Sequence, residues 1–216
     1  VFGRYQLALT HGKGCKLYDA DGNEYLDFLA GIAVNSLGHA HPALVKAISE
    51  QAAKLMHCSN IYYTDIQAKA VKEIIETTGF DRVFLANSGA EANEGAIKLA
   101  RKYGHQKNEG KYRIITAVHS FHGRTMMTVT ATGQPKYQQG YEPLPAGFDY
   151  VPYGDLEALR EAMDEDVCCV LLEPIQGEGG VHVPSDTYLH EARLLCDKYD
   201  ALLVFDEIQT GVARTG

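Results

Sequence analysis

A regular alternation of continuous apolar runs with stretches of helical spacing constrains the fold of this chain more than any other feature. Unbroken apolar runs are typical of parallel strands that are covered on both faces. The helical stretches between them supply the crossovers that such strands need. The sequence therefore predicts a three-layer α/β domain with a mostly parallel sheet. The expected strands are Val83–Asn87, Arg113–Val118, Val167–Glu173 and Leu202–Asp206, and the expected helices span roughly residues 89–104, 155–164 and 186–199.

The beginning of the chain has a different pattern. Lys16–Asp19 and Glu24–Phe28 are short strand-like runs joined by a turn that contains Gly22, which predicts a small hairpin. We therefore expect residues 1–40 to form a separate N-terminal segment.

The large domain is expected over residues 41–216. Pro42 is a suitable first residue for its first helix. Thr64 and Gln67 have the spacing of a capping box, which predicts the start of a second helix.

The charge and the cysteines exclude several classes of protein. The net charge is −8, whereas a nucleic-acid surface needs clustered Lys and Arg, so no nucleic-acid partner is expected. No apolar stretch reaches membrane-spanning length, and we expect a cytoplasmic protein without a membrane partner.

The cysteines form no CxxC pair, and His39 and His41 have no third ligand at a recognisable spacing, so no metal site is expected. The five cysteines are Cys15, Cys58, Cys168, Cys169 and Cys196.

Parallel sheets bind ligands outside the carboxyl ends of their strands, where this chain has several polar clusters. The first is Ser88-Gly-Ala-Glu91, at the start of a long alanine-rich helix. The N–H groups of Gly89 and Ala90 could hold a phosphate there. Ser88 and Glu91 also have the spacing of an ordinary capping box, and both interpretations stay open.

The second and third clusters are also ambiguous by themselves. His119-Ser-Phe-His-Gly-Arg124 could supply a stacking surface and a fork for a carboxylate, or simply a loop with a buried Phe and a surface Arg. Pro174-Ile-Gln-Gly-Glu-Gly-Gly180 indicates only a mobile glycine-rich loop, because the GxGxxG fingerprint of dinucleotide sites is absent.

The last expected strand ends in Asp206-Glu-Ile-Gln209, which is similar to the Walker B strand of an NTPase. That function requires a phosphate-binding loop with Gly-Lys followed by Ser or Thr, and the sequence contains none. A carboxylate at this position could instead hold the ring nitrogen of a cofactor in its protonated form.

The order of these motifs resembles that of the class III aminotransferases, which depend on pyridoxal 5'-phosphate. The resemblance covers essentially the whole chain and includes Asn87–Asn93, Phe121–Arg124, Glu173–Glu178 and Asp206–Gln209. Gly31–Asn35, Ser59–Tyr63 and Phe121-His122 are most similar to the acetylornithine branch of that family. The resemblance implies the large domain of a fold type I pyridoxal-phosphate transferase, incomplete at its C-terminus, and a homodimer.

The resemblance also implies roles for individual residues. Asp206, paired with the pyridinium nitrogen, and Glu173, orienting its neighbours, would serve catalysis. Phe121 and Ile208 would pack on the two faces of the ring, and Gln209 would contact its phenolic oxygen. The implied cofactor set is Ser88, Gly89, Ala90, Phe121, His122, Asp206, Glu207, Ile208 and Gln209. The implied substrate set is Arg124 for the α-carboxylate, Glu178, Ile32 and Phe2.

One departure from the family pattern concerns lysine. The family's cofactor-binding lysine lies a few dozen residues past the aspartate, whereas all twelve lysines of this sequence precede Asp206. Because a core strand is expected only about ten residues before Gly216, we expect the natural chain to continue and this piece to be inactive alone.

The implied reaction is amino transfer between N-acetylornithine and 2-oxoglutarate, with small amino acids and 2-oxo acids as substrates. Three alternatives remain open from the sequence: another ω-aminotransferase acting on ornithine, succinylornithine or 4-aminobutyrate, a catalytically inactive fragment, and a pyridoxal-phosphate-dependent mutase.

Overall fold

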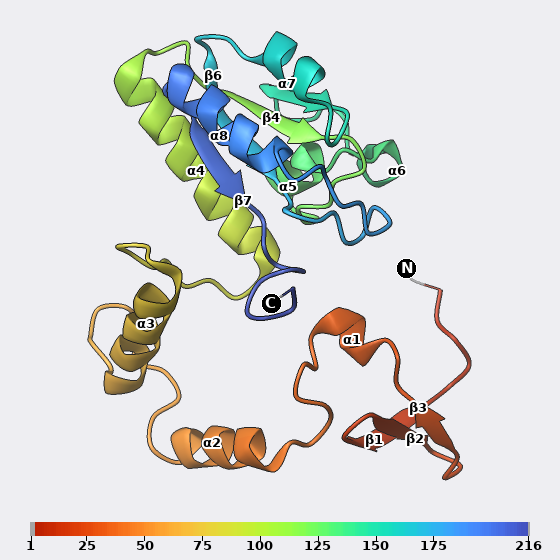
Figure 1. The fold of residues 1–216 in the computed structure, drawn as a ribbon. Helices are drawn as coiled ribbons and strands as arrows, with labels where there is room; N and C mark the ends of the chain where they lie inside the picture. The colour runs from red at the N-terminus through yellow and green to blue at the C-terminus, as the bar shows by residue number, and fades with distance from the viewer. Residues whose placement is uncertain (1–2, 216) are drawn as a thin grey trace. The chain divides into compact units, whose positions relative to one another are not determined.

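The computed structural model describes residues 3–215, which divide into two compact units that meet in sequence between Asp81 and Arg82 (Figure 1). The first unit thus contains two helices that the sequence analysis assigned to the large domain. The division of the chain into domains at residue 40 stays a prediction.

The first unit contains a three-stranded antiparallel sheet in the order β1-β2-β3. The predicted hairpin is confirmed, and Gly22 permits its turn because its φ is 84°. The side chain of Thr64 accepts a hydrogen bond from the Gln67 N–H, which confirms the predicted helix start. The elements are β1 (Leu9–Lys13), β2 (Lys16–Asp19), β3 (Glu24–Leu26), α1 (Ala30–Ala33), α2 (Pro42–Ala52) and α3 (Asp65–Thr78).

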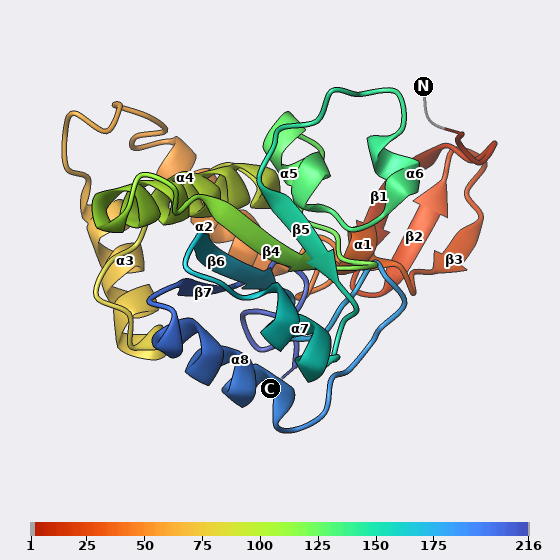
Figure 2. The same cartoon turned by 90° about the horizontal axis from the view of Figure 1, so that it is seen from above.

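The second unit is the predicted three-layer α/β domain. Its four strands are all parallel, in the order β5-β4-β6-β7. Figure 2 shows α4 and α5 on one face of this sheet and α7 and α8 on the other. The elements are α4 (Gly89–Lys107), β4 (Arg113–Ala117), α5 (Met126–Ala131), α6 (Pro135–Gln138), β5 (Phe148–Val151), α7 (Leu156–Ala162), β6 (Val167–Leu172), α8 (Tyr188–Lys198) and β7 (Leu202–Phe205).

The central strand β6 explains why its sequence is apolar without interruption. All six of its residues are buried, and from Cys169 to Leu172 successive side chains belong to different layers. Leu171 joins the cluster that contains Ile97 of α4, whereas Leu172 joins the cluster that contains Ala192 of α8. Both faces of the strand therefore lie in a hydrophobic core, as predicted.

Three of the four expected strands are confirmed as β4, β6 and β7, and the expected strand Val83–Asn87 is wrong. That segment pairs with no strand among residues 3–215, and its Phe84 and Leu85 side chains are exposed. Apolar composition does not by itself provide a ladder partner. The edge strand β5, whose four residues include the polar Asp149, was not predicted from the sequence.

Two further findings concern the whole described chain. No helix within residues 3–215 is long and apolar enough to cross a membrane. All five cysteines are free thiols, and Cys168, Cys169 and Cys196 are buried.

Burial of β6 leads to a prediction about stability. Leu171→Ala would leave a cavity in a fully enclosed position, so we expect the free energy of unfolding to fall by about 2–5 kcal/mol. The matched control is Leu194→Ala on the exposed face of α8, which should change it by no more than about 0.5 kcal/mol. Equilibrium urea unfolding measures both, and equal effects of the two substitutions would contradict the assignment of the core.

Candidate functional site

A pocket of about 310 Å³ lies at the carboxyl ends of the parallel strands in the second unit. Ligands of open α/β sheets bind at such edges, and the volume is within the range of small-molecule sites. It combines apolar walls with two carboxylates and a guanidinium. The lining residues are Gly89, Ala90, Asn93, Phe121, His122, Gly123, Arg124, Glu173, Asp206, Ile208 and Gln209.

A second cleft in the same unit is larger, about 640 Å³, but its lining has less chemistry. It contains His119 and His182 together with neutral residues, and no carboxylate or guanidinium. Specific sites place convergent polar groups in one pocket, and the smaller pocket does so with charged groups of both signs, whereas the larger cleft has none of these carboxylates or guanidinium groups. Size alone therefore does not identify the functional site here.

The start of α4 forms one wall of the smaller pocket. Ser88 accepts a hydrogen bond from the Glu91 N–H at 3.2 Å, which confirms its capping function. Gly89 and Ala90 are the first two helical residues, whose N–H groups have no acceptor within a helix. A Cβ at Gly89 would lie 2.8 Å from Cγ1 of Ile208, so this position admits only glycine without rearrangement. Capping and anion binding are thus compatible at this helix end.

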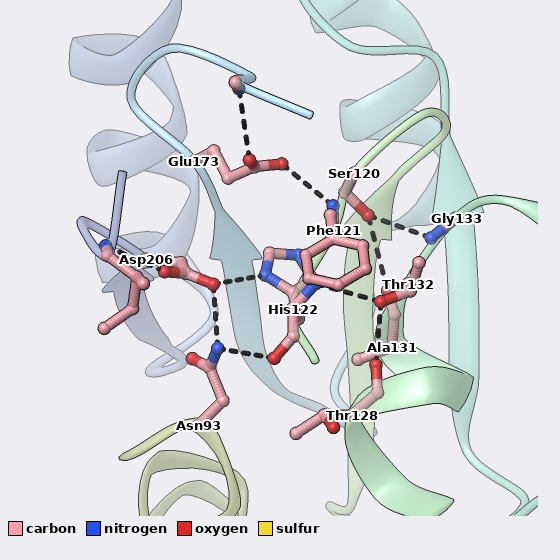
Figure 3. Close-up of polar contacts among 12 residues, drawn as sticks. Asn93, Ser120, Phe121, His122, Thr128, Ala131, Thr132, Gly133, Glu173 and Asp206 are labelled. Atoms are coloured by element: carbon pink, nitrogen blue, oxygen red, sulfur yellow. Dashed lines mark hydrogen bonds and ion pairs between the residues drawn. The ribbon is translucent and has the colours of Figure 1, made fainter. Parts of the chain in front are cut away.

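Asp206 is the centre of a buried network that joins three elements (Figure 3). Its Oδ2 lies 2.8 Å from Nδ1 of His122 and accepts a hydrogen bond from Nδ2 of Asn93 at 2.7 Å. Its Oδ1 accepts the Ile208 N–H at 3.1 Å. A carboxylate offers about four acceptor sites, so three donors leave room for one more.

The network keeps Asp206 ionised. Burial by itself raises the pKa of this carboxyl. The hydrogen bonds from His122 and Asn93, together with the electrostatic attraction of His122, outweigh burial, so the pKa lies below its ordinary value. An ionised carboxylate only accepts, so the proton of the contact is on Nδ1 of His122. Nε2 of His122 is buried and has no partner among the described residues.

Glu173 connects the loops that follow β4 and β6. Its Oε2 accepts the Phe121 N–H at 3.1 Å and its Oε1 accepts the Gly177 N–H at 3.3 Å (Figure 3). Burial raises the pKa of this carboxyl. Glu173 therefore fixes the backbone at Phe121.

The other end of the pocket contains a cation. Cζ of Arg124 lies 5.4 Å from the ring centroid of Tyr137, which also meets Phe121 edge-on at 5.5 Å. The preceding Gly123 has a φ of 135°, and a Cβ there would lie 2.6 Å from Oγ1 of Thr128. Glycine is therefore required for the turn that brings Arg124 to the pocket.

The structure brings most of the predicted site residues together, although their roles remain predictions. Ser88 is adjacent to the pocket, whereas Glu207 and Glu178 are not among the described lining side chains. Ile32 belongs to the first unit, and Phe2 lies outside the described residues. The predicted residues that line the pocket are Gly89, Ala90, Phe121, His122, Arg124, Glu173, Asp206, Ile208 and Gln209.

No role was predicted from the sequence for Asn93, Gly123 or Tyr137. Asn93 could have been found, because it lies four residues after Gly89 and so on the same face of α4. The sequence contains no comparable signal for Tyr137. No cluster of three or more metal-ligating His, Cys, Asp or Glu side chains occurs within residues 3–215.

Comparisons with known proteins agree with this geometry. The profile of the family described as Aminotransferase class-III matches residues 3–216. The chain is 56% identical over 217 residues to the acetylornithine aminotransferase of Caldanaerobacter subterraneus subsp. tengcongensis, covering 100% of this chain and 55% of that protein. The chain thus spans about half the length of the curated relatives it matches.

Two crystal structures have similar folds. The ornithine aminotransferase of Toxoplasma gondii ME49 matches with a TM-score of 0.94 and 38% identity, covering 99% of this chain and 52% of that one. The N-acetylornithine aminotransferase of Stenotrophomonas maltophilia K279a matches with a TM-score of 0.83 and 43% identity, covering 96% of this chain and 52% of that one.

The Asp206 network leads to a prediction about pH. His122→Phe removes one donor and keeps a ring in the buried position, so burial should dominate and the pKa of Asp206 should rise. Because the folded-state pKa of wild-type Asp206 is lowered, its contribution to stability is present above the ordinary value of about 3.9. That contribution is lost as the pH falls through the folded-state pKa. In the variant, a folded-state pKa above the ordinary value reverses the sign, so that ionised Asp206 lowers stability as the pH rises through the raised pKa.

The measurement is the ¹³C shift of the Asp206 carboxyl carbon as a function of pH. His105→Phe, on the exposed face of α4, is the matched control and should leave the midpoint unchanged. A His122→Phe variant with the wild-type midpoint would show that the network does not hold the charge.

Proposed function

Since this chain belongs to the class-III aminotransferase family, we propose that the protein transfers an amino group between N-acetylornithine and 2-oxoglutarate with pyridoxal 5'-phosphate as its cofactor. The observation that carries the proposal is the buried, ionised Asp206 in a pocket that also presents a helix start and an arginine. The name of the Caldanaerobacter relative, an acetylornithine aminotransferase, supports this substrate.

The phosphate of the cofactor fits the start of α4. The N–H groups of Gly89 and Ala90 are available to an anion, and the positive end of the helix dipole favours negative charge there. Ile208 lies so close to Gly89 that a side chain at position 89 would fill the space that a phosphate needs. Ser88 orients this turn through its cap.

The ring of the cofactor fits between apolar walls and a fixed carboxylate. Phe121 and Ile208 would pack on its faces, Gln209 would contact its phenolic oxygen, and Glu207 belongs to the same turn. When bound, pyridoxal phosphate supplies an aldehyde that takes up the amino group and a pyridinium ring that withdraws electrons from the reacting carbon. Asp206 has one acceptor site left for the N–H of that ring, and His122 and Asn93 hold it in its ionised form.

The substrate would bind at the other end of the pocket. Arg124 presents a planar fork that matches the α-carboxylate of an amino acid. The proposed substrate set also includes Glu178, Ile32 and Phe2. These three residues are proposed from the family resemblance. Glu173 acts indirectly by fixing Phe121. Among the described residues no lysine lines the pocket, so the base that moves the proton is not assigned within this chain.

We extend the proposal to a cytoplasmic homodimer whose substrates are small amino acids and 2-oxo acids. Ornithine is a second candidate donor, because the crystal structure of an ornithine aminotransferase matches this fold with the TM-score of 0.94.

The test compares donors directly. The natural full-length protein, loaded with pyridoxal phosphate, is given 2-oxoglutarate and either N-acetylornithine, ornithine or 4-aminobutyrate, and the glutamate formed is measured. We expect kcat/KM for N-acetylornithine to exceed the others by at least about tenfold, a difference of about 1.4 kcal/mol in transition-state binding. Preference for ornithine would replace the substrate assignment, and absence of glutamate with every donor would overturn the proposed function.

The role of Asp206 gives a sharper prediction. Asp206→Asn keeps the size of the side chain but removes the charge that holds the ring nitrogen protonated, so we expect kcat to fall by about 10²–10³-fold. Asp186→Asn, at an exposed aspartate before α8, is the control and should retain wild-type turnover. If Asp206→Asn retained it too, the carboxylate would have no part in the reaction.

A further inference from the structure

Tyr137 lies between several of the predicted site residues, although it belongs to none of the predicted motifs. It belongs to α6, in the connection between β4 and β5, and it is half-buried. Its ring contacts both Phe121 and Arg124, as described above, and its hydroxyl donates a hydrogen bond to Oε1 of Glu178 at 3.0 Å. One side chain therefore touches the cation and the anion that are proposed to bind substrate.

The backbone on both sides of Tyr137 is tied to neighbouring segments. Nε2 of Gln134 donates to the Ser120 carbonyl at 3.0 Å, immediately before Phe121. Nε2 of Gln138 donates to the Thr132 carbonyl at 2.9 Å and to the Thr130 carbonyl at 3.2 Å. These bonds hold α6 against the loop that follows β4 and against the end of α5. The backbone that carries Tyr137 is thus held independently of the contact with Glu178.

The loop that carries Glu178 is anchored at its base. Gln176 and His182 exchange two backbone hydrogen bonds, and Nε2 of Gln176 donates to the Val118 carbonyl at 2.9 Å. Gly179 lies so close to His119 that a Cβ would be 2.4 Å from its carbonyl oxygen. Because the base is fixed in this way, the bond from Tyr137 determines where the carboxylate of Glu178 lies.

The charges give this bond a consequence for substrate choice. Arg124 attracts any α-carboxylate, whereas the negative charge of Glu178 repels a second carboxylate in the same region. A hydroxyl that donates to Glu178 fixes that charge in one place and compensates part of it. Dicarboxylates such as 2-oxoglutarate should depend on this compensation more than a donor whose only carboxylate is held by Arg124.

We propose that Tyr137 is a positioning residue that sets Glu178 relative to Arg124 and thereby admits the dicarboxylate substrate. The inference rests on the proposed function for the identity of the substrates. It assigns to the hydroxyl a role separate from that of the ring, which supports Arg124 and Phe121 by packing.

The experiment uses the natural full-length protein loaded with pyridoxal phosphate and the variants Tyr137→Phe, Glu178→Gln and their combination. Tyr137→Phe keeps the ring and removes only the hydroxyl. We expect the KM for 2-oxoglutarate to rise about tenfold with little change in kcat, as for the loss of a hydrogen bond to a charged group. The kcat/KM for N-acetylornithine should change less than about twofold, which is well below the effect of losing one hydrogen bond to a charged group.

The double variant shows whether Tyr137 acts through Glu178. If it does, adding Tyr137→Phe to Glu178→Gln should raise the KM for 2-oxoglutarate by less than about twofold, because the partner of the hydroxyl is already uncharged. The inference would be overturned if Tyr137→Phe lowered kcat/KM equally for both substrates. It would also be overturned if the tenfold rise in the KM for 2-oxoglutarate persisted in the Glu178→Gln background. Tyr112→Phe, at an exposed tyrosine before β4, is the matched control and should behave as the wild type.

A binding measurement separates this inference from the proposed function. Calorimetric titration with glutarate, an unreactive five-carbon dicarboxylate, requires no turnover. We expect Tyr137→Phe to raise the Kd about tenfold and Tyr112→Phe to leave it unchanged. Wild-type protein that binds no glutarate, or variant protein that binds it equally well, would overturn the role of Tyr137. Failure of turnover together with the expected Kd change would overturn only the aminotransferase proposal.

Discussion

The second unit depends on burial of both faces of its parallel sheet. With β6 enclosed on each side, its side chains from Cys169 to Leu172 alternate between two hydrophobic clusters, and helices must cover both faces. Right-handed crossovers then return every strand in the same direction, so all carboxyl ends reach one edge. Glu173 follows β6 and Asp206 follows β7 for this reason. The site is thus a consequence of how the apolar residues are covered, and the strand ends are where polar side chains can be placed without breaking the core.

Burying Asp206 beside that core has a cost that its partners offset. A carboxylate removed from water favours its neutral form unless donors compensate, and His122 and Asn93 supply two. Nδ2 of Asn93 also donates to the His122 carbonyl at 2.9 Å, so the three residues hold one another in place. Glu173 accepts hydrogen bonds from two backbone N–H groups of the described chain, but burial outweighs them and raises its pKa. The pKa values of two carboxyls at one sheet edge thus move in opposite directions, because the donors outweigh burial at Asp206 and burial outweighs the donors at Glu173.

The sequence was sufficient to predict the layers, three of the four strands and most pocket residues, because apolar runs and motifs at their ends are local signals. Val83–Asn87 was mispredicted as a strand because composition does not specify a partner. The network could not be predicted in the same way: Asn93 and Asp206 are 113 residues apart and His122 and Asp206 are 84 apart. Tyr137 was missed for the same reason, since its contacts with Arg124 and Glu178 exist only once the connection to β5 has folded back.

The two ends of the pocket are built for different tasks. At the buried end, Asp206 is enclosed and bound by three donors, so its charge and position cannot respond to a ligand. At the other end, the exposed side chains of Arg124 and Glu178 meet one half-buried tyrosine, Arg124 over its ring and Glu178 at its hydroxyl. A rigid end suits a group that must stay in one electronic state through every cycle. An exposed end suits exchange between a donor and an acceptor with different numbers of carboxylates, because only small movements of the side chains are needed to alter the local charge. Substitutions that change substrate preference without loss of the chemistry should therefore concentrate around Tyr137 rather than around Asp206.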